Sequence, residues 1–152
     1  MRTIVFRGKR TDNDEWVYGT PIFQDCYVLI RFWNTEEFEF EEYLVAPETI
    51  SEFTGLTDKN GTRIFEGDIV KTQPFSDRPY SQRAKYKQHI GVVEYCVDHF
   101  KNNLYEQDYK ASWQVSIKDY GKYGCCDWSA FFKCEVIGNI YDNPELLKGE
   151  QE

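Results

Sequence analysis

A cysteine and a histidine three residues apart form the pattern that most resembles a chemical site. Cys96 and His99 have the Cys-x2-His spacing of a zinc ligand pair, and the further thiols Cys125, Cys126 and Cys134 follow downstream. No pair of Cys-x2-Cys spacing accompanies them, and on a continuous strand residues 96 and 99 point to opposite faces. We therefore expect no bound metal and interpret the five cysteines as buried or surface thiols.

Catalysis by a nucleophile or by an acid–base pair has little support. The imidazole bases are His89 and His99, and the chain contains no Gly-x-Ser-x-Gly elbow. Glu66 and Asp68 flank Gly67 and resemble a carboxylate pair, but Asp68 is better suited to hydrogen-bond the amides of a turn. We expect no enzyme activity, no catalytic residues and no cofactor. A metal- or thiol-dependent enzyme is the alternative.

A basic, aromatic segment is the main candidate for a binding site. Residues 71–90 carry five cations against one carboxylate, a local charge of +4 in a chain of net charge −8. Aromatic rings beside cations suit single-stranded nucleic acid, because rings stack on bases and cations meet phosphates. The same composition suits an acidic protein surface or a solvated loop. The candidate binding residues are Arg78, Tyr80, Arg83, Lys85, Tyr86 and Lys87.

The run Asp58-Lys-Asn-Gly61 resembles part of a calcium loop, and its spacing rejects that function. If Gly61 is the sixth residue of such a loop, Leu56 and Gly67 occupy the first and twelfth positions. Neither has a side-chain oxygen to coordinate calcium. The run instead predicts a tight turn, because Asn60 and Gly61 tolerate positive φ.

These segments belong to a chain that can bury a core. It has 152 residues, of which 41% are hydrophobic and 17% aromatic, and this composition favours a globule rich in strands. No apolar run has the length that a bilayer requires, and none follows Met1 as a signal peptide would. We therefore expect a cytoplasmic protein. The net charge of −8 argues against general coating of nucleic acid.

Hydrophobic patterning predicts the strands. Nearly continuous apolar residues from Cys26 to Trp33 predict a strand covered on both faces. Strict alternation over 37–41 predicts a charged edge strand in which Phe38 and Phe40 face one way and the glutamates face water. Residues 100–108 are polar and indicate irregular structure. Alternation over 111–117 places three apolar side chains on one face: Trp113, Val115 and Ile117.

Glycines and turn residues fix the backbone path in the middle and at the end of the chain. Gly55 is expected to break the chain, and a sharp turn at Gly67 leads into a strand. Near the end, Asn143 as cap and Pro144 at the first helical position predict a helix start. The residues that we expect to be structural are Gly55, Asn60, Gly61, Gly67, Asp68, Gly138 and Pro144.

Several stretches, in one order along the chain, are similar to the signatures of a single family. The central stretch from Pro47 to Val70 and the late stretch from Val136 to Leu147 match two of its patterns. Phe6-Arg7 with Trp16-Val-Tyr-Gly19 resembles its start, and Gly91-Val-Val-Glu94 lies between the others. The chain thereby resembles the YopX family, which is carried by phages and by prophages in bacterial genomes.

The resemblance implies a mainly β fold (β-rich α+β) with a small barrel of the Src-homology-3 type in the C-terminal part. We expect an N-terminal β segment over 1–45, a β-barrel domain over 46–147 that ends in a short helical turn, and a disordered tail over 148–152. The resemblance also implies a mobile-element origin and self-association, and it carries over no catalytic residues. The expected function is binding of a protein partner or of a second copy. A nucleic-acid-binding accessory role of the basic segment is the alternative.

Overall fold

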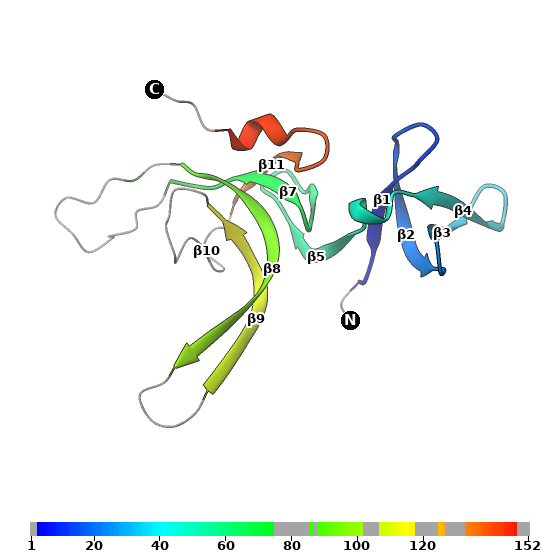
Figure 1. The fold of residues 1–152 in the computed structure, drawn as a ribbon. Coiled ribbons are helices and arrows are strands. Elements are labelled where there is room, and N and C mark those ends of the chain that lie inside the picture. Colours follow the sequence, from blue (N-terminus) through cyan, green and yellow to red (C-terminus); the bar gives the residue numbers. More distant parts are fainter. Residues whose placement is uncertain are drawn as a thin grey trace. The chain divides into compact units, whose positions relative to one another are not determined.

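The fold is mainly β, as expected, and it divides into two compact units (Figure 1). The computed structural model describes residues 3–74, 86, 88–101, 107–117, 125–126 and 133–148. Unit 1 comprises Met1–Gly55 and unit 2 comprises Leu56–Glu152. Residue 45, where the N-terminal segment was expected to end, is the last residue of a strand of unit 1. The Src-homology-3-like form of the C-terminal part stays a prediction.

Unit 1 consists of strands that follow one another in nearly chain order. They are β1 (Phe6–Lys9), β2 (Trp16–Phe23), β3 (Val28–Asn34), β4 (Glu39–Val45) and β5 (Ser51–Thr57), with the 3-10 turn η1 (Pro47–Thr49) before β5. The order of hydrogen-bonded strands in the sheet is β4-β3-β2-β1-β5-β6, in which the last two residues of β5 and all of β6 (Arg63–Phe65) belong to unit 2. The pairs β1–β2, β2–β3 and β3–β4 are all antiparallel.

The end of β4 returns to the residues that follow β1. Arg10 and Val45 form an isolated antiparallel bridge. Beside it, the backbone N–H of Thr11 donates a hydrogen bond to the carbonyl of Leu44 over 3.1 Å. The four strands from β1 to β4 therefore close on themselves at this end, a device that removes part of an exposed strand edge.

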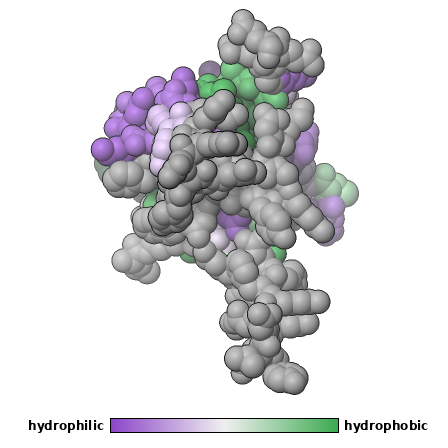
Figure 2. All heavy atoms as spheres, turned by 90° about the vertical axis from the view of Figure 1, so that its left-hand side faces the viewer, coloured by the Kyte–Doolittle hydropathy of each residue, from purple (hydrophilic) through white to green (hydrophobic). Residues whose placement is uncertain are grey.

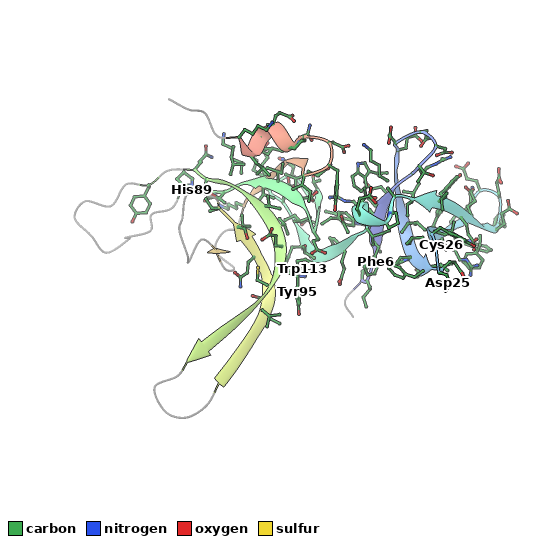
Figure 3. The ribbon with its side chains drawn as sticks, in the orientation of Figure 1. Phe6, Asp25, Cys26, His89, Tyr95 and Trp113 are labelled. Atoms are coloured by element: carbon green, nitrogen blue, oxygen red, sulfur yellow. The ribbon has the colours of Figure 1, made fainter. Side chains whose placement is uncertain are left out.

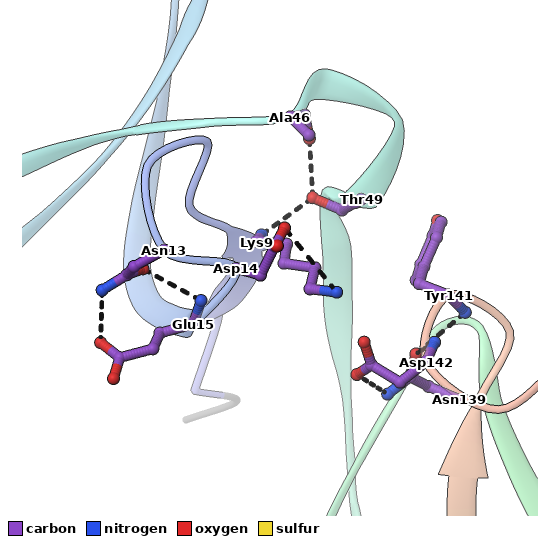
Figure 4. A network of polar contacts seen from close by, with 9 residues as sticks. All are labelled: Lys9, Asn13, Asp14, Glu15, Ala46, Thr49, Asn139, Tyr141 and Asp142. Carbon is purple, nitrogen blue, oxygen red and sulfur yellow. Dashed lines mark hydrogen bonds and ion pairs between the residues drawn. The ribbon is translucent and has the colours of Figure 1, made fainter.

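Thr49 of η1 stabilises the contact between the end of β4 and the end of β1 (Figure 4). Its Oγ1 accepts a hydrogen bond from the backbone N–H of Lys9 over 2.8 Å and donates one to the carbonyl of Ala46 over 2.7 Å. The N–H of Ala46 in turn donates to the carbonyl of Lys9 over 2.9 Å. One buried hydroxyl thus ties the turn after β4 to β1.

One face of β3 fills the core of unit 1, and the other face is open. Arg31 and Trp33 on the open face are exposed, so the expectation of a strand covered on both faces is wrong. The continuous apolar run concealed the alternation because Leu29 and Trp33, which face outward, are apolar too. The core consists of Val28, Ile30 and Val45, with Phe6, Val17 and Ile50 packed against it.

Strand β4 is the charged edge strand that alternation predicts, but the side chains exposed to solvent are not those expected. It begins at Glu39, after a turn in which Phe38 has a φ of 55° and is 77% exposed. Phe40 is also exposed, whereas Glu41 is half-buried and accepts hydrogen bonds from the side chains of Asn34 and Tyr43. The expectation that the glutamates face water is therefore wrong for Glu41, and the two phenylalanines are exposed as well. The inner face of β3 and β4 turns polar beyond the core, and Glu41 belongs to that polar part.

Unit 2 contains a five-stranded antiparallel sheet of order β10-β9-β8-β7-β11. Its strands are β7 (Asp68–Lys71), β8 (Ile90–Lys101), β9 (Gln107–Ser116), β10 (Cys125–Cys126) and β11 (Glu135–Asn139). The pairing of β8 with β9 extends as far as Lys101 and Gln107. The irregular structure expected over 100–108 is thus wrong for the described residues 100–101 and 107–108, while 102–106 lie outside the described part.

The core of unit 2 gathers residues from most of its strands. Trp113 and Val115 of β9, together with Ile117 just after this strand, contribute to this core, as alternation predicts. Its buried members are Ile64, Val70, Val93, Val115, Ile117 and Cys134, with Leu56, Trp113 and Val136 packed against them.

The C-terminal helical turn is η3 (Pro144–Leu147), a 3-10 turn. Pro144 occupies its start, as expected, because the missing N–H of proline costs nothing there. Asn143 makes no side-chain cap hydrogen bond, so its expected role as a cap is wrong. Within the residues that the structure describes, no helix is long and apolar enough to cross a membrane.

Candidate protein-binding surface

The β8–β9 hairpin carries the core of unit 2 beyond the rest of its sheet. β8 has 12 residues and β9 has 10, whereas β7 has 4 and β11 has 5. Strand β7 pairs with β8 only at residues 90–92. Figure 1 shows the two long strands running on as a curved ribbon past β7 and β11. The outer part of the hairpin is therefore a two-stranded ribbon.

One face of this ribbon is a continuous row of apolar side chains. Val93 and Val115 lie opposite each other at its inner end, and both are 0% exposed. The next pair on the same face is Tyr95 with Trp113, and Val97 follows. Tyr95 and Val97 are each 53% exposed. The row thus passes from the core into solvent within two steps along β8.

Tyr95 and Trp113 form the aromatic centre of the row. Their ring centroids are 5.1 Å apart and the ring planes meet at 69°, an edge-to-face contact (Figure 3). Such a pair contributes about 0.5–1.5 kcal/mol beyond the area it buries. Trp113 also packs on the core, while Ala111, opposite Val97, is exposed. We call Tyr95, Val97, Ala111 and Trp113 the hairpin face.

The opposite face of the ribbon is mostly polar, although it also carries Val92 and Cys96, and its Gln114 is buried. The hydroxyl of Ser116 donates a hydrogen bond to the carboxylate of Glu94 over 2.5 Å, and the amide of Gln114 donates to the hydroxyl of Ser112 over 3.5 Å. On the side that Figure 2 presents, a patch of hydrophilic side chains lies at the upper left, next to hydrophobic side chains at the top. The hairpin face is therefore the more apolar of the two faces of the ribbon.

A tight turn at Gly67 fixes the base of the hairpin. Gly67 has a φ of 75°; its N–H donates to the carbonyl of Val93 over 2.8 Å, and its carbonyl accepts from the N–H of Ile140 over 2.9 Å. Asp68 is 1% exposed, and its Oδ2 accepts a hydrogen bond from the N–H of Phe65 over 2.8 Å. The turn thus holds β8 and the segment after β11 together.

A second turn, which contains Asn60 and Gly61, is organised by the carboxylate of Asp58. Its Oδ1 accepts hydrogen bonds from the N–H groups of Asn60 and Thr62 over 2.8 and 2.9 Å, and its Oδ2 accepts one from Val136 over 3.1 Å. Burial raises the pKa of this carboxyl, but the three backbone hydrogen bonds outweigh burial, so the pKa lies below its ordinary 3.8. Gly61 supplies a φ of 84°.

The remaining residues expected to be structural also occupy constrained backbone positions. Gly55 lies within β5 with a φ of 87°, so the strand passes through it and does not break there. A Cβ on Gly138 would lie 2.5 Å from Oδ1 of Asn143. Only a residue without a side chain fits that approach.

The predicted binding residues of the basic segment lie almost entirely outside the described residues. Tyr86 is described and is 60% exposed. The others lie outside that part of the chain: Arg78, Tyr80, Arg83, Lys85 and Lys87. The nucleic-acid alternative therefore stays a prediction. Sequence reasoning missed the hairpin face, because the alternation of Val93, Tyr95 and Val97 indicates a shared face but not that Tyr95 and Val97 are exposed.

Cys134 is unsuited to nucleophilic catalysis. Its side chain is fully buried, and burial, with the charges of Asp58 and Asp68 adding to it, raises the pKa of the thiol to about 11. The described residues contain no group of three or more His, Cys, Asp or Glu side chains that could hold a metal ion. The zinc hypothesis stays open because it involves side chains outside the described part, those of His99, Cys125 and Cys126.

Nearly the whole chain is similar to known proteins. Residues 5–148 match a family model described as "YopX protein". The chain is also similar to the solved structure "Crystal structure of protein EF1440 from Enterococcus faecalis", with 23% identity and a TM-score of 0.49, over 97% of this chain and 99% of that one. No curated protein matches the chain.

Proposed function

The chain belongs to the YopX family, and we propose that this member acts by binding, not by catalysis, and associates with a second copy of itself through the hairpin face. A single observation carries the proposal. The apolar row that begins with the buried Val93 continues into solvent at Tyr95 and Val97. An apolar row that leaves the core of its own unit suits burial in an interface.

The energetics of the ribbon favour a partner. A two-stranded ribbon is marginally stable in water by itself, and its inner end alone is supported by the core. Covering Tyr95 and Val97 removes apolar area from water, which stabilises the association by about 25 cal/mol for each Å² buried. Aromatic side chains such as Tyr95 and Trp113 are also enriched at the centres of interfaces.

The hairpin face itself carries no charge that opposes a second copy as the occupant. A two-fold contact places one surface against itself, so each charge on it meets an identical charge. The net charge of −8 makes most of such contacts repulsive. The hairpin face is composed of two aromatic and two small apolar residues and carries no charge, so self-contact there places no like charges against each other within the contact.

We also propose that the protein has no catalytic role and works in the cytoplasm of a bacterial host as a phage or prophage product. The raised pKa of the buried Cys134 thiol supports the first part. The resemblance to a family carried by phages supports the second.

Sedimentation velocity from about 1 to 200 μM tests self-association. We expect a concentration-dependent dimer for the unchanged protein and at least a tenfold weaker dimer for Val97→Asp, which places a charge on the exposed end of the hairpin face. Tyr95→Ser removes apolar area without adding charge, and it should weaken the dimer in the same direction.

Ser112→Asp is the charge control, because it adds the same charge to the opposite face of the same ribbon, at a half-buried position. It should leave the dimer unchanged, and circular dichroism should show all three variants folded. A protein that stays monomeric at 200 μM, or a dimer that is indifferent to Val97→Asp, overturns the proposal.

A further inference from the structure

Strand β4 of unit 1 has a free edge along most of its length. It is the last strand of its sheet, and its return to the residues after β1 begins at Leu44. Among the residues that the structure describes, no strand pairs with the outer edge of residues 39–43. A free edge is a template for an added strand.

The hydrogen bond at the closure reveals which backbone groups point to this edge. The carbonyl of Leu44 points outward, because it accepts from the N–H of Thr11. Backbone groups in a strand alternate in direction with a period of two. The N–H and C=O groups of Phe40 and Glu42 therefore point to the same edge, where they can pair with an incoming strand.

The pairing of β3 with β4 agrees with this direction. It makes the pairs Phe40–Trp33 and Glu42–Arg31 the non-hydrogen-bonded ones, in which opposite side chains lie closest. The rings of Trp33 and Phe40 are 4.9 Å apart at their centroids, and Nε of Arg31 donates to Oε1 of Glu42 over 2.6 Å. Both pairs make the close contacts that this geometry requires.

A mainly apolar strip, interrupted by the ion pair of Arg31 with Glu42, runs beside the free edge on the open face of the sheet. Trp33 is 48% exposed, Phe40 is 64% exposed and Leu44 is 46% exposed. An added strand places its own alternate side chains on this face, next to Phe40 and Leu44. Apolar side chains at those positions would extend the strip and be covered by it.

The other face of the edge is acidic. Of the five glutamates in residues 35–45, Glu39 and Glu41 lie on this face of β4, whereas Glu42 lies on the open face and pairs with Arg31. Glu39 is exposed on this face, and Glu41 lies beside it with its carboxylate bound to Asn34 and Tyr43. Alternate side chains of an added strand that lie next to Glu39 and Glu41 are therefore favoured if they are cations. Like charges opposite each other repel, so the β4 edge of a second copy is a poor occupant.

We propose that the free edge of β4 is a strand-addition site for an extended segment of a partner protein in which Lys or Arg alternates with apolar residues. Main-chain hydrogen bonds to Phe40 and Glu42 provide the binding. The acidic face selects cations, and the Trp33–Phe40–Leu44 strip selects the apolar residues. This site is separate from the hairpin face, and it does not rest on self-association.

Three labelled peptides test the site by fluorescence anisotropy at low salt. The first is the seven-residue Lys-Val-Lys-Val-Lys-Val-Lys, the second has Glu at every Lys position, and the third is the first with alternate backbone amides N-methylated. We expect the first to bind and the other two to bind at least tenfold more weakly. The N-methylated peptide keeps the charge of the first but cannot pair with a strand edge.

Protein variants and amide exchange complete the test. Glu39→Lys should weaken the first peptide at least tenfold, whereas Glu145→Lys, an equal charge change in η3 of unit 2, should not. Hydrogen exchange of the N–H groups of Phe40 and Glu42 should slow at least tenfold with the peptide bound. No binding of the first peptide, equal binding of its N-methylated form, unchanged amide exchange, or an equal effect of both charge variants overturns the proposal.

Discussion

The carboxylate of Asp58 accepts a hydrogen bond from the backbone N–H of Val136, 78 residues later in the chain, over 3.1 Å. The same carboxylate accepts the N–H groups of Asn60 and Thr62 within its own turn. One side chain therefore shapes a local turn and fastens it to β11. Lys59, next in the chain, adds an ion pair to Glu135 over 2.6 Å. This anchor has a predictable pH dependence.

Asp58→Asn is expected to destabilise unit 2 at neutral pH by about 1–3 kcal/mol, because the amide nitrogen cannot accept the N–H of Val136. The pKa of Asp58 is lower folded than unfolded. The stability from its ionised form is therefore fully present above the unfolded pKa of about 3.9, and it is lost as the pH falls through the folded pKa. Urea unfolding should show the difference between the two proteins shrinking from pH 6 to pH 2.5.

Asp25→Asn is the control for this experiment, because Asp25 is exposed in unit 1. Its urea midpoint should match that of the unchanged protein at both pH values. A difference between Asp58→Asn and the unchanged protein that is equal at pH 6 and pH 2.5 contradicts the assignment.

Gly19→Ala should destabilise unit 1 by about 3 kcal/mol, the upper part of the usual range for overpacking. A Cβ at this position collides with the backbone carbonyl of Arg31 on β3, and backbone cannot rotate away as a side chain can. Gly61→Ala is the comparison: nothing lies within 4 Å of its Cβ, and only its φ of 84° is unfavourable. It should cost about 1 kcal/mol. Equal thermal midpoints for the two variants contradict this account.

The cysteines should differ sharply in reactivity. At pH 8 a thiol with a pKa of about 11, that of Cys134, is about 0.1% thiolate, and the thiolate is the reactive form. Cys26 is exposed, so reagent reaches it directly. Iodoacetamide followed by peptide mass spectrometry should label Cys26 in the folded protein and Cys134 only after unfolding in guanidinium. Rapid labelling of Cys134 in the folded protein would contradict this prediction and make Cys134 a possible nucleophile.

The nucleic-acid alternative makes its own prediction for the basic segment. It requires retention on immobilised single-stranded DNA that falls steeply with salt and is lost on charge reversal at Arg83, Lys85 and Lys87. Val97→Asp should not affect that retention, which separates the two functions. Retention that survives the reversal, or no retention at low salt, removes the alternative.

Local patterns predicted those features that depend on neighbours in the chain. The shared face of Trp113, Val115 and Ile117 follows from alternation alone, and so does the existence of the edge strand β4. The half-buried position of Glu41 does not follow from alternation. It depends on the register between β3 and β4 and on the side chains of Asn34 and Tyr43, which donate hydrogen bonds to its carboxylate. Alternation shows that two sets of side chains separate, but not which set meets the core.

The hairpin face was hidden for a related reason. Tyr95 and Val97 continue the pattern of the buried Val93, so a sequence pattern places all three in a core. Their exposure arises because β7 stops pairing with β8 at Val92. The length of β7 is a long-range property, and the pattern of residues along β8 does not indicate where β7 ends.

The bridge between Arg10 and Val45 has a consequence for the order of events during synthesis. The bridge joins the end of β4 to the residue after β1, so that the strands from β1 to β4 form a closed ring. All four strands lie within the first 45 residues, so this ring needs no residue of unit 2. The ribosome releases the N-terminal part of a chain first, and domains generally fold as units in that order. We expect the ring from β1 to β4 to close while most of unit 2 is still being made, so that the nascent hairpin emerges from the ribosome behind a part that is already folded.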